Sequence, residues 1–388
     1  MNFQNKLKAT NFDFFDKPSS NFPPSDYRSR HFKGKWVRHY VNNLIELQLS
    51  KGFTSSQEDL FGHNQEHLPK HLYKFFKIND RNINSILSGN IKLSQTNKFN
   101  DPFDCHLLVE QETYLKDYLL KELKNSNNVT KEGGKDKLSE QEYWKIYYSQ
   151  TTEAKSRNIF SPGMASFQTI LFEIQQQKSD EFWLTINRIQ VKGSQECSKK
   201  TNQLRKNQLL ISCFSKFLEE EEMLINNPMW AHYTDNHKGI CIRYKIDSKR
   251  QEKSIVLNNL FPVHYTSVAP KISSKELLKE KDILNLKNPK ILKAAYKTFL
   301  TKSMFWNYEK EWRLVLDAKL LENRISDPIE FLEIDKIYLG LNINQILKDK
   351  ILKYCDENGI EVLKTKMRNE KFQLDTFPVN GSNYKSNK

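Results

Sequence analysis

Hydrophobic residues recur along this chain with two periods, which predicts both strands and helices. Between Ile240 and Ile246 apolar side chains occupy every second position, as in a strand with one buried face. Between Trp36 and Leu49 they recur at helical spacing, which predicts an amphipathic helix. Further strands are predicted at 71–76, 91–94, 209–215, 261–265, 313–316, 337–341 and 360–366, and further helices at 80–88, 289–305 and 344–358. This mixture favours an α+β fold with a mixed or antiparallel sheet core and a helical insertion.

The same patterns divide the chain into three parts. Residues 1–68 are polar and prolines interrupt their first third, so we expect an accessory extension that is partly disordered at its start. Residues 69–370 form the α+β domain, with a helical insert at 110–207, and residues 371–388 form a C-terminal tail. Within the insert, Ser139 and Glu142 have the spacing of a capping box at a helix start.

Composition gives the chain a basic surface. Lys and Arg number 61 and Asp and Glu 47 among 388 residues, which leaves a net charge of +14. This balance suits a polyanionic partner such as nucleic acid. Abundant Lys, Asn, Ile, Phe and Tyr are also typical of an AT-rich coding sequence, so the charge can arise without such a partner. No basic run is longer than a pair, which argues against a dedicated basic arm.

Cysteine usage and hydropathy indicate a cytoplasmic protein. The five cysteines are an odd number and none has CxxC spacing, so we expect neither a disulfide framework nor a zinc site. No stretch reaches the ~18 apolar residues of a membrane span, so we expect no membrane contact, and the first residues lack a signal-peptide core. The sequence leaves the oligomeric state open.

The most informative motif is Glu309-Lys310-Glu311, which precedes Arg313. If the strand begins by Glu309, both carboxylates and the guanidinium project from one face, while Trp312 faces the other side with Leu314. Such a face is either a surface charge ladder or a site. In a site, a carboxylate beside a cationic centre can stabilise an oxocarbenium-like transition state. The aromatic residues just before the motif could stack on a flat ring such as nicotinamide.

Other polar groups offer less specific chemistry. Trp230, His232, Tyr233, Asp235 and His237 lie within eight positions, but the two histidines are five residues apart and point away from each other on a helix. We therefore expect a hydrogen-bonded structural or ligand-contacting group there, and no metal site.

A second polar group lies in a predicted turn. Asn100, Asp101 and Asp104 could bind a divalent cation, but an Asx-Pro turn explains the same residues. Cys213 has no paired base nearby, so a buried small residue is its expected role. The chain has no P-loop, GxGxxG or GxSxG motif.

Several blocks taken in order resemble a bacterial family, domain of unknown function 2971. The blocks are LYKFF (72–76), IKLSQTNKFNDPFD (91–104), ISCFSK (211–216), MWAHYTDNHKGICIRY (229–244), HY (264–265) and FWNYEKEWRL (305–314). They cover roughly residues 69–370, without the extension and the helical insert. The resemblance implies a cytoplasmic bacterial protein, and some members look similar in type to abortive-infection proteins of antiviral defence.

A second resemblance is to ADP-ribosyltransferases, particularly toxins that modify DNA. It implies NAD as cofactor and a site built from three strands. Tyr73 and Lys74 match its opening position, where those enzymes usually have Arg or His. Ser212 or Ser215 matches the middle position, and the ExE position falls on Glu309 and Glu311.

These resemblances lead to an expected function. We expect an anti-phage effector, an NAD-dependent toxin in which Glu311 stabilises the reacting centre and Glu309 positions the acceptor. The candidate cofactor-binding residues are Tyr73, Lys74, Ser212, Ser215, Trp230, His232, Tyr233 and Arg313. Nucleic acid is the expected target and a phage protein the expected trigger. Two alternatives stay open: a non-catalytic module that senses nucleic acid or a phage protein, and a metal-dependent nuclease that uses Asp101, Asp104 and Glu311.

Overall fold

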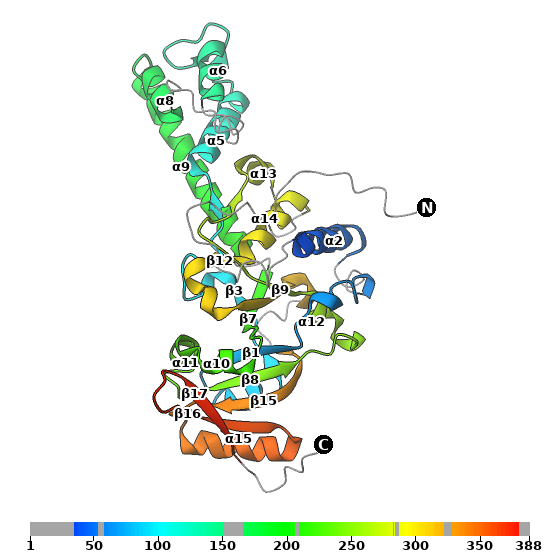
Figure 1. Cartoon of the computed structure of the whole chain (residues 1–388). Helices are drawn as coiled ribbons and strands as arrows, with labels where there is room; N and C mark the ends of the chain where they lie inside the picture. Colours follow the sequence, from blue (N-terminus) through cyan, green and yellow to red (C-terminus); the bar gives the residue numbers. More distant parts are fainter. Residues whose placement is uncertain are drawn as a thin grey trace. The chain divides into compact units, whose positions relative to one another are not determined.

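The computed structural model describes residues 35–52, 58–149, 166–205, 209–281, 283, 287–321 and 328–379 (Figure 1). The expected disordered start, 1–34, and the last residues of the expected tail, 380–388, lie outside these ranges. The chain divides into two compact units. The first combines residues 1–105, 209–268 and 299–388, and the second combines residues 106–208 and 269–298.

A mixed sheet forms the centre of the first unit. In the described part of the chain it has nine strands, and eight of them follow one path. In spatial order these are β17 (Leu374–Pro378), β16 (Glu361–Met367), β15 (Glu333–Leu339), β8 (Ile240–Lys245), β1 (His71–Phe76), β7 (Leu209–Ser215), β13 (Glu311–Asp317) and β9 (Leu260–Pro262), while β3 (Ser94–Gln95) also pairs with β7. Residues 374–378 thus join the sheet, although they fall within the segment expected to be a tail.

Neighbouring strands of this sheet run antiparallel, except for one pair. β15 and β16 run parallel, and helix α15 (Gln345–Asn358) connects them along the sheet (Figure 1), because parallel neighbours need a long crossover. Asn344 caps this helix through its side chain, and Gly359 ends it in the left-handed conformation. The predicted α+β fold with a mixed sheet is confirmed.

Both faces of the sheet are buried, and they differ in character. One face carries alternate strand residues such as Leu72, Ile242 and Leu314, and packs aliphatic side chains of α4, α12 and α15. The other face is more aromatic, with Tyr73 and Phe75 packed against residues of α10 and α11. The polar residues of the site belong to this second face.

Short elements complete the first unit. They are α2 (Lys35–Lys51), η2 (Gln65–His67), α4 (Ile83–Leu87), β2 (Asn90–Ile91), η3 (Thr96–Lys98), α10 (Glu220–Leu224), α11 (Asn227–Tyr233), η5 (Gln251–Lys253), α12 (Ser254–Asn258), β10 (His264–Thr266), β12 (Thr301–Ser303), η6 (Met304–Glu309), η7 (Ala318–Leu321) and β14 (Ile329–Glu330). α2 confirms the helix expected from the apolar spacing after Trp36, and its Val37, Val41 and Leu44 are buried.

The second unit is mainly helical. Its elements are β4 (Leu108–Val109), α5 (Gln111–Asn125), β5 (Val129–Thr130), β6 (Leu138–Ser139), α6 (Glu140–Tyr148), α8 (Phe167–Gln175), α9 (Asp180–Gln203), β11 (Lys271–Ile272), α13 (Ser274–Lys279) and α14 (Pro289–Phe299). The predicted capping box at Ser139 and Glu142 is present, with both reciprocal hydrogen bonds formed. No helix among the described residues is long and apolar enough to cross a membrane.

Gly239, just before β8, is required by a close backbone approach. A Cβ atom at this position would lie 2.0 Å from the carbonyl oxygen of Phe76, which no side chain tolerates without a shift of the backbone. We therefore expect Gly239→Ala to lower the free energy of unfolding by about 3 kcal/mol, as overpacked core sites do. Urea denaturation followed by circular dichroism measures this change. A loss below about 0.5 kcal/mol, the range of surface substitutions, would contradict it.

Candidate active site

The acidic motif adopts a local structure that differs from the expected continuous strand. Glu309 ends the 3₁₀ helix η6, and Lys310 takes the left-handed conformation with φ 48° and ψ 48° before β13 begins at Glu311. The condition that the strand begins by Glu309 is therefore not met, because the positive φ of Lys310 interrupts the extended backbone. From Glu311 onward the prediction holds. Glu311 and Arg313 share one face, while Trp312 and Leu314 pack into the aliphatic core on the other.

Lys302 joins the two glutamates that the kink separates. Its ammonium lies 2.5 Å from Glu309 Oε2, 3.0 Å from Glu311 Oε2 and 3.4 Å from Asp104 Oδ2. All four side chains are at most 7% exposed. Burial opposes the charge on Lys302, but the three carboxylates outweigh burial and raise its pKa. The pair of glutamates is therefore enclosed in the interior and is not a surface charge ladder.

Arg313 is the second cation of this group and is fully buried. Its Nε donates to Glu311 Oε1 at 2.8 Å, and Nη2 donates to both carboxylate oxygens of Asp104 at 2.9 and 2.8 Å. Nη1 donates to the carbonyl of Phe299 at 2.7 Å and contacts the sulfur of Cys105 at 3.0 Å. We call Asp104, Lys302, Glu309, Glu311 and Arg313 the buried charge cluster.

Asp104 reaches the cluster from a tight turn. The side chain of Asp101 accepts a hydrogen bond from the backbone N–H of Phe103 at 2.8 Å, as an Asx turn does. This supports the turn interpretation of these residues over the cation-site interpretation. Within the described ranges no three His, Cys, Asp or Glu side chains gather to hold a metal ion.

The two glutamates of the cluster carry opposite pKa shifts. With all groups ionised, three carboxylates face two cations, so the cluster has one excess negative charge. Burial and the neighbouring Glu311 raise the pKa of Glu309, so both disfavour a negative charge on this residue. Burial also opposes ionisation of Glu311, but Arg313 and Lys302 outweigh it and hold the pKa of Glu311 well below its ordinary value. Glu311 therefore holds its negative charge more firmly than Glu309, which is the first of the two to take up a proton.

Three further residues of the sheet lie in line with Glu311. The register pairs Glu311 with Ser215, Ser215 with Tyr73, and Tyr73 with Arg243. Directly paired residues point to the same face of a sheet, so these four side chains form what we call the cross-strand row. Adjacent strands are ~4.8 Å apart, so Tyr73 and Glu311 are about 10 Å apart along the row. Two of the predicted positions, Tyr73 and Ser215, thus share a face with Glu311.

Ser212 and Lys74 belong to the opposite face. Ser212 pairs with Leu314 of the aliphatic core, and it accepts a hydrogen bond from Lys74 Nζ at 3.1 Å. The same ammonium donates to the carbonyl of Cys213 at 2.6 Å. Burial lowers the pKa of Lys74. Of the two serines considered for the middle position, the structure therefore places Ser215 beside Glu311.

The aromatic helix α11 contributes one residue to the site. The hydroxyl of Tyr233 donates to Glu309 Oε1 at 2.6 Å, which fixes the side chain of that glutamate. Trp230 is fully buried and its indole N–H donates to the carbonyl of Met223 at 3.3 Å, so in this conformation it offers no free face to a ligand. His232 is exposed, and no contact of the charge cluster involves it among the described residues.

Three residues of the site escaped the sequence analysis. Lys302 falls inside the segment expected to be a helix, but it lies on β12, beside Tyr265 of β10. The hydroxyl of Tyr265 accepts the backbone N–H of Glu311 at 2.8 Å. Arg243 joins the row through strand pairing with Tyr73 and through a side-chain hydrogen bond to it, and it forms ion pairs with Asp335 and Glu220. Tyr265 and Arg243 lie in two blocks of the resemblance, at 264–265 and 229–244, whereas Lys302 lies in none.

Comparison with known proteins identifies part of the chain. Residues 229–314 match the family model described as Protein of unknown function (DUF2971). The predicted family is confirmed over this segment. No curated protein and no solved structure matches the chain.

The DUF2971 segment contains most of the charge cluster. It runs from α11 into β13, and it includes the following site residues: Tyr233, Arg243, Tyr265, Lys302, Glu309, Glu311 and Arg313. Tyr73, Asp104 and Ser215 lie outside it, in the other blocks of the resemblance, yet they complete the cluster and the row. The wider match over 69–370 stays a prediction, supported by this convergence.

Proposed function

We propose that this protein is an NAD-dependent ADP-ribosyltransferase-like toxin that acts in anti-phage defence, with nucleic acid as acceptor. The observation that carries the proposal is the cross-strand row, in which Tyr73 and Ser215 lead to Glu311 at the edge of the buried charge cluster. The row follows the order of positions that the resemblance to ADP-ribosyltransferases implies. The defence role and the trigger by a phage protein rest on resemblance alone.

The two glutamates suit different roles in the proposed reaction. When environments push the pKa values of two carboxylates apart, the pair can divide the work of charge stabilisation and proton transfer. Glu311, held anionic by Arg313 and Lys302, would stabilise positive charge at the ribose. Glu309, with its raised pKa and its hydrogen bond from Tyr233, would accept the proton of the incoming acceptor.

The proposed step is a substitution at the ribose C1′ of NAD. The bond between C1′ and the nicotinamide nitrogen breaks, and its electron pair leaves with neutral nicotinamide. An oxygen or nitrogen of the acceptor forms the new bond to C1′, and its proton passes to Glu309. Tyr73, which belongs to the cross-strand row, and Tyr233, which contacts Glu309 of the charge cluster, would line the nicotinamide and ribose. Both side chains are buried or half-buried, so NAD entry requires them to move.

The test compares the two serines of β7. The full chain is incubated with NAD and total cellular nucleic acid, and NAD loss and mass gain on the nucleic acid are measured. Ser215→Ala is expected to lower the rate about 10- to 100-fold, the effect of losing one hydrogen bond made in the transition state. Ser212→Ala, on the opposite face of the same strand, is the matched control and is expected to change the rate less than about threefold.

Two results would contradict the proposal. If the wild-type chain consumes no NAD under any acceptor condition, the transfer reaction is wrong. If Ser212→Ala lowers the rate as much as Ser215→Ala while both variants remain folded, the reacting face has been misassigned. Folding of each variant is checked by circular dichroism and thermal unfolding.

A second candidate function is a non-catalytic module that senses nucleic acid or a phage protein. It is favoured by the complete enclosure of Glu311, whose two oxygens are both occupied by cationic side chains. In that case the charge cluster only stabilises the fold, and the lysine and arginine side chains that give the chain its net charge of +14 contact the phosphates of the nucleic acid. Nucleic-acid affinity that falls steeply with salt, together with no NAD consumption, would favour this function. The carboxylates of Asp104 and Glu311 already pair with Lys302 and Arg313. A divalent cation would have to displace these side chains, so the structure does not favour the metal-dependent nuclease.

A further inference from the structure

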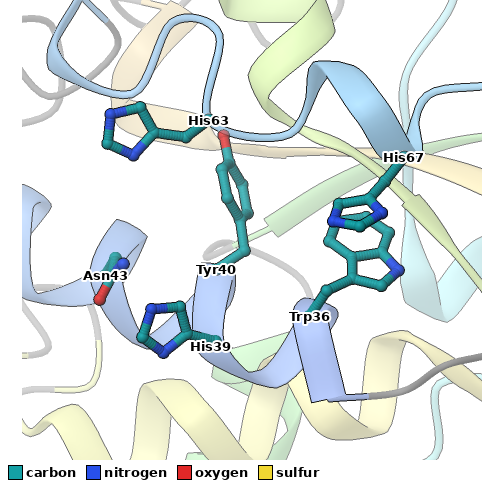
Figure 2. A pocket seen from close by; sticks show the side chains of 6 residues that line it. All are labelled: Trp36, His39, Tyr40, Asn43, His63 and His67. Carbon is teal, nitrogen blue, oxygen red and sulfur yellow. The ribbon is translucent and has the colours of Figure 1, made fainter.

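A pocket of about 270 Å³ lies beside α2, apart from the charge cluster. Four residues of α2 line it, and two histidines come from the segment that follows. The lining residues are Trp36, His39, Tyr40, Asn43, His63 and His67. Figure 2 shows the ring of Tyr40 between the stacked Trp36–His67 pair on one side and His39 with Asn43 on the other.

Both walls of the pocket are fixed to the same part of the first unit. On α2, the hydroxyl of Tyr40 donates to the carbonyl of Asn258 at 2.9 Å. On the other wall, Asn64 donates to the carbonyl of Leu257 at 2.8 Å, and Gln65 donates to the carbonyl of Ser248 at 2.8 Å. These bonds hold His63 and His67, the neighbours of Asn64 and Gln65, opposite α2. The pocket is therefore built into the fold and does not depend on a ligand to form.

The lining chemistry selects a flat ligand with a hydrogen-bonding edge. Trp36 and His67 are parallel within 15° and their ring centres are 4.4 Å apart, so they stack on each other, and a flat ligand can extend this stack on an outer face of the pair. The described lining contains five rings and one amide, with no carboxylate and no aliphatic side chain. Aromatic side chains stack on nucleobases regardless of sequence, and an Asn amide can pair with a base edge.

The volume of the pocket and the net charge of the chain further limit the kind of ligand that can bind. Sites for drug-sized molecules are typically about 300–1,000 Å³, so this pocket suits one base and not a whole dinucleotide such as NAD. The three histidines do not form a metal site, because no such group occurs in the described part of the chain. The net charge of +14 favours a base that belongs to a polyanion.

We propose that the pocket formed by α2 and the segment carrying His63 and His67 binds a single unpaired base of a nucleic-acid strand. The inference goes beyond the proposed transfer reaction, because it assigns a second site with a ligand of its own. Stacking on an outer face of the Trp36–His67 pair provides the affinity, and Asn43 contacts the edge of the base. A duplex does not offer its bases in this way, so single strands are preferred.

The test is fluorescence anisotropy of a labelled single-stranded 15-mer with the full chain, without NAD. Trp36→Ala is expected to weaken binding about tenfold or more, the effect of removing one base-stacking partner. Trp36→Phe keeps a stacking ring and should stay within about threefold of wild type. Trp183→Ala removes another partly exposed tryptophan, 39% exposed on α9, and is the matched control. Binding by that variant should match wild type.

Several outcomes would overturn the inference. They are wild-type affinity in Trp36→Ala, an equal loss in Trp183→Ala, or a fully paired duplex that binds as tightly and depends equally on Trp36. Tighter binding of free AMP than of the 15-mer would assign the pocket to a mononucleotide and overturn the strand part of the inference. Asn43→Ala gives a second variant, expected to weaken binding several-fold, should Trp36→Ala fail to fold. Because this binding experiment contains no NAD, a negative result would not count against the proposed transfer reaction.

Discussion

Glu311→Gln is expected to lower the rate of NAD consumption about 100- to 1,000-fold. Gln keeps the size of the side chain and one oxygen that can accept from Arg313, but it removes the negative charge. In the proposed reaction this charge lies beside the cationic ribose centre, within a site that excludes water and therefore strengthens electrostatic effects. The measurement is the initial rate of nicotinamide release, followed by chromatography at equal concentrations of folded protein.

Glu196→Gln is the matched control for this prediction. Glu196 also pairs with a buried lysine, at 2.8 Å from Lys200 on α9, but its own side chain is half-buried and it belongs to the second unit. Its variant is expected to consume NAD at the wild-type rate. A folded Glu311→Gln protein with full activity would show that the charge cluster is structural, and it would move the assignment to the sensing module.

Arg313→Met is expected to lower the free energy of unfolding by about 3–5 kcal/mol. Met fills a similar volume, but it leaves Asp104 and Glu311 in the interior without the guanidinium that pairs with both. Removing one partner of a buried ion pair costs more than the pair itself contributes, because a buried charge is left uncompensated. The measurement is the urea denaturation midpoint and slope, followed by circular dichroism.

Arg250→Met provides the control for the stability prediction. Arg250 pairs with Glu252 at 2.9 Å, but its side chain is 44% exposed, and such surface pairs contribute only about 0–1 kcal/mol. A loss in Arg313→Met no larger than that of Arg250→Met would show that water or neighbouring groups replace the guanidinium. The buried charge cluster would then need another explanation for its cohesion.

The sequence predicts the elements of the sheet well and their partners poorly. Alternation alone places β8 and the face of Arg313, because burial of one face fixes the period of a strand. It cannot choose between Ser212 and Ser215, since that choice depends on the pairing register of β7 with β1 and β13. A shift of one residue would exchange the faces, and register is a property of the assembled sheet.

The charge cluster also could be predicted only in part from the sequence. The Glu-Lys-Glu motif is visible in the sequence, but the kink at Lys310 is not, because lysine has no preference for the left-handed conformation. Lys302 has no motif around it, and Asp104 meets Arg313 across 209 positions of sequence. Long-range ion pairs of this kind follow from topology and leave no local pattern.

The distance in sequence between Asp104 and Arg313 also determines when the charge cluster can form during synthesis. Asp104 and Arg313 are 209 residues apart, and ribosomes add about 5–20 residues per second. Arg313 therefore emerges ~10–40 s after its carboxylate partner, and β13, the strand between β7 and β9, cannot enter the sheet before then. The nascent chain therefore cannot complete the buried charge cluster, nor any reaction that depends on it, until residue 313 has been synthesised.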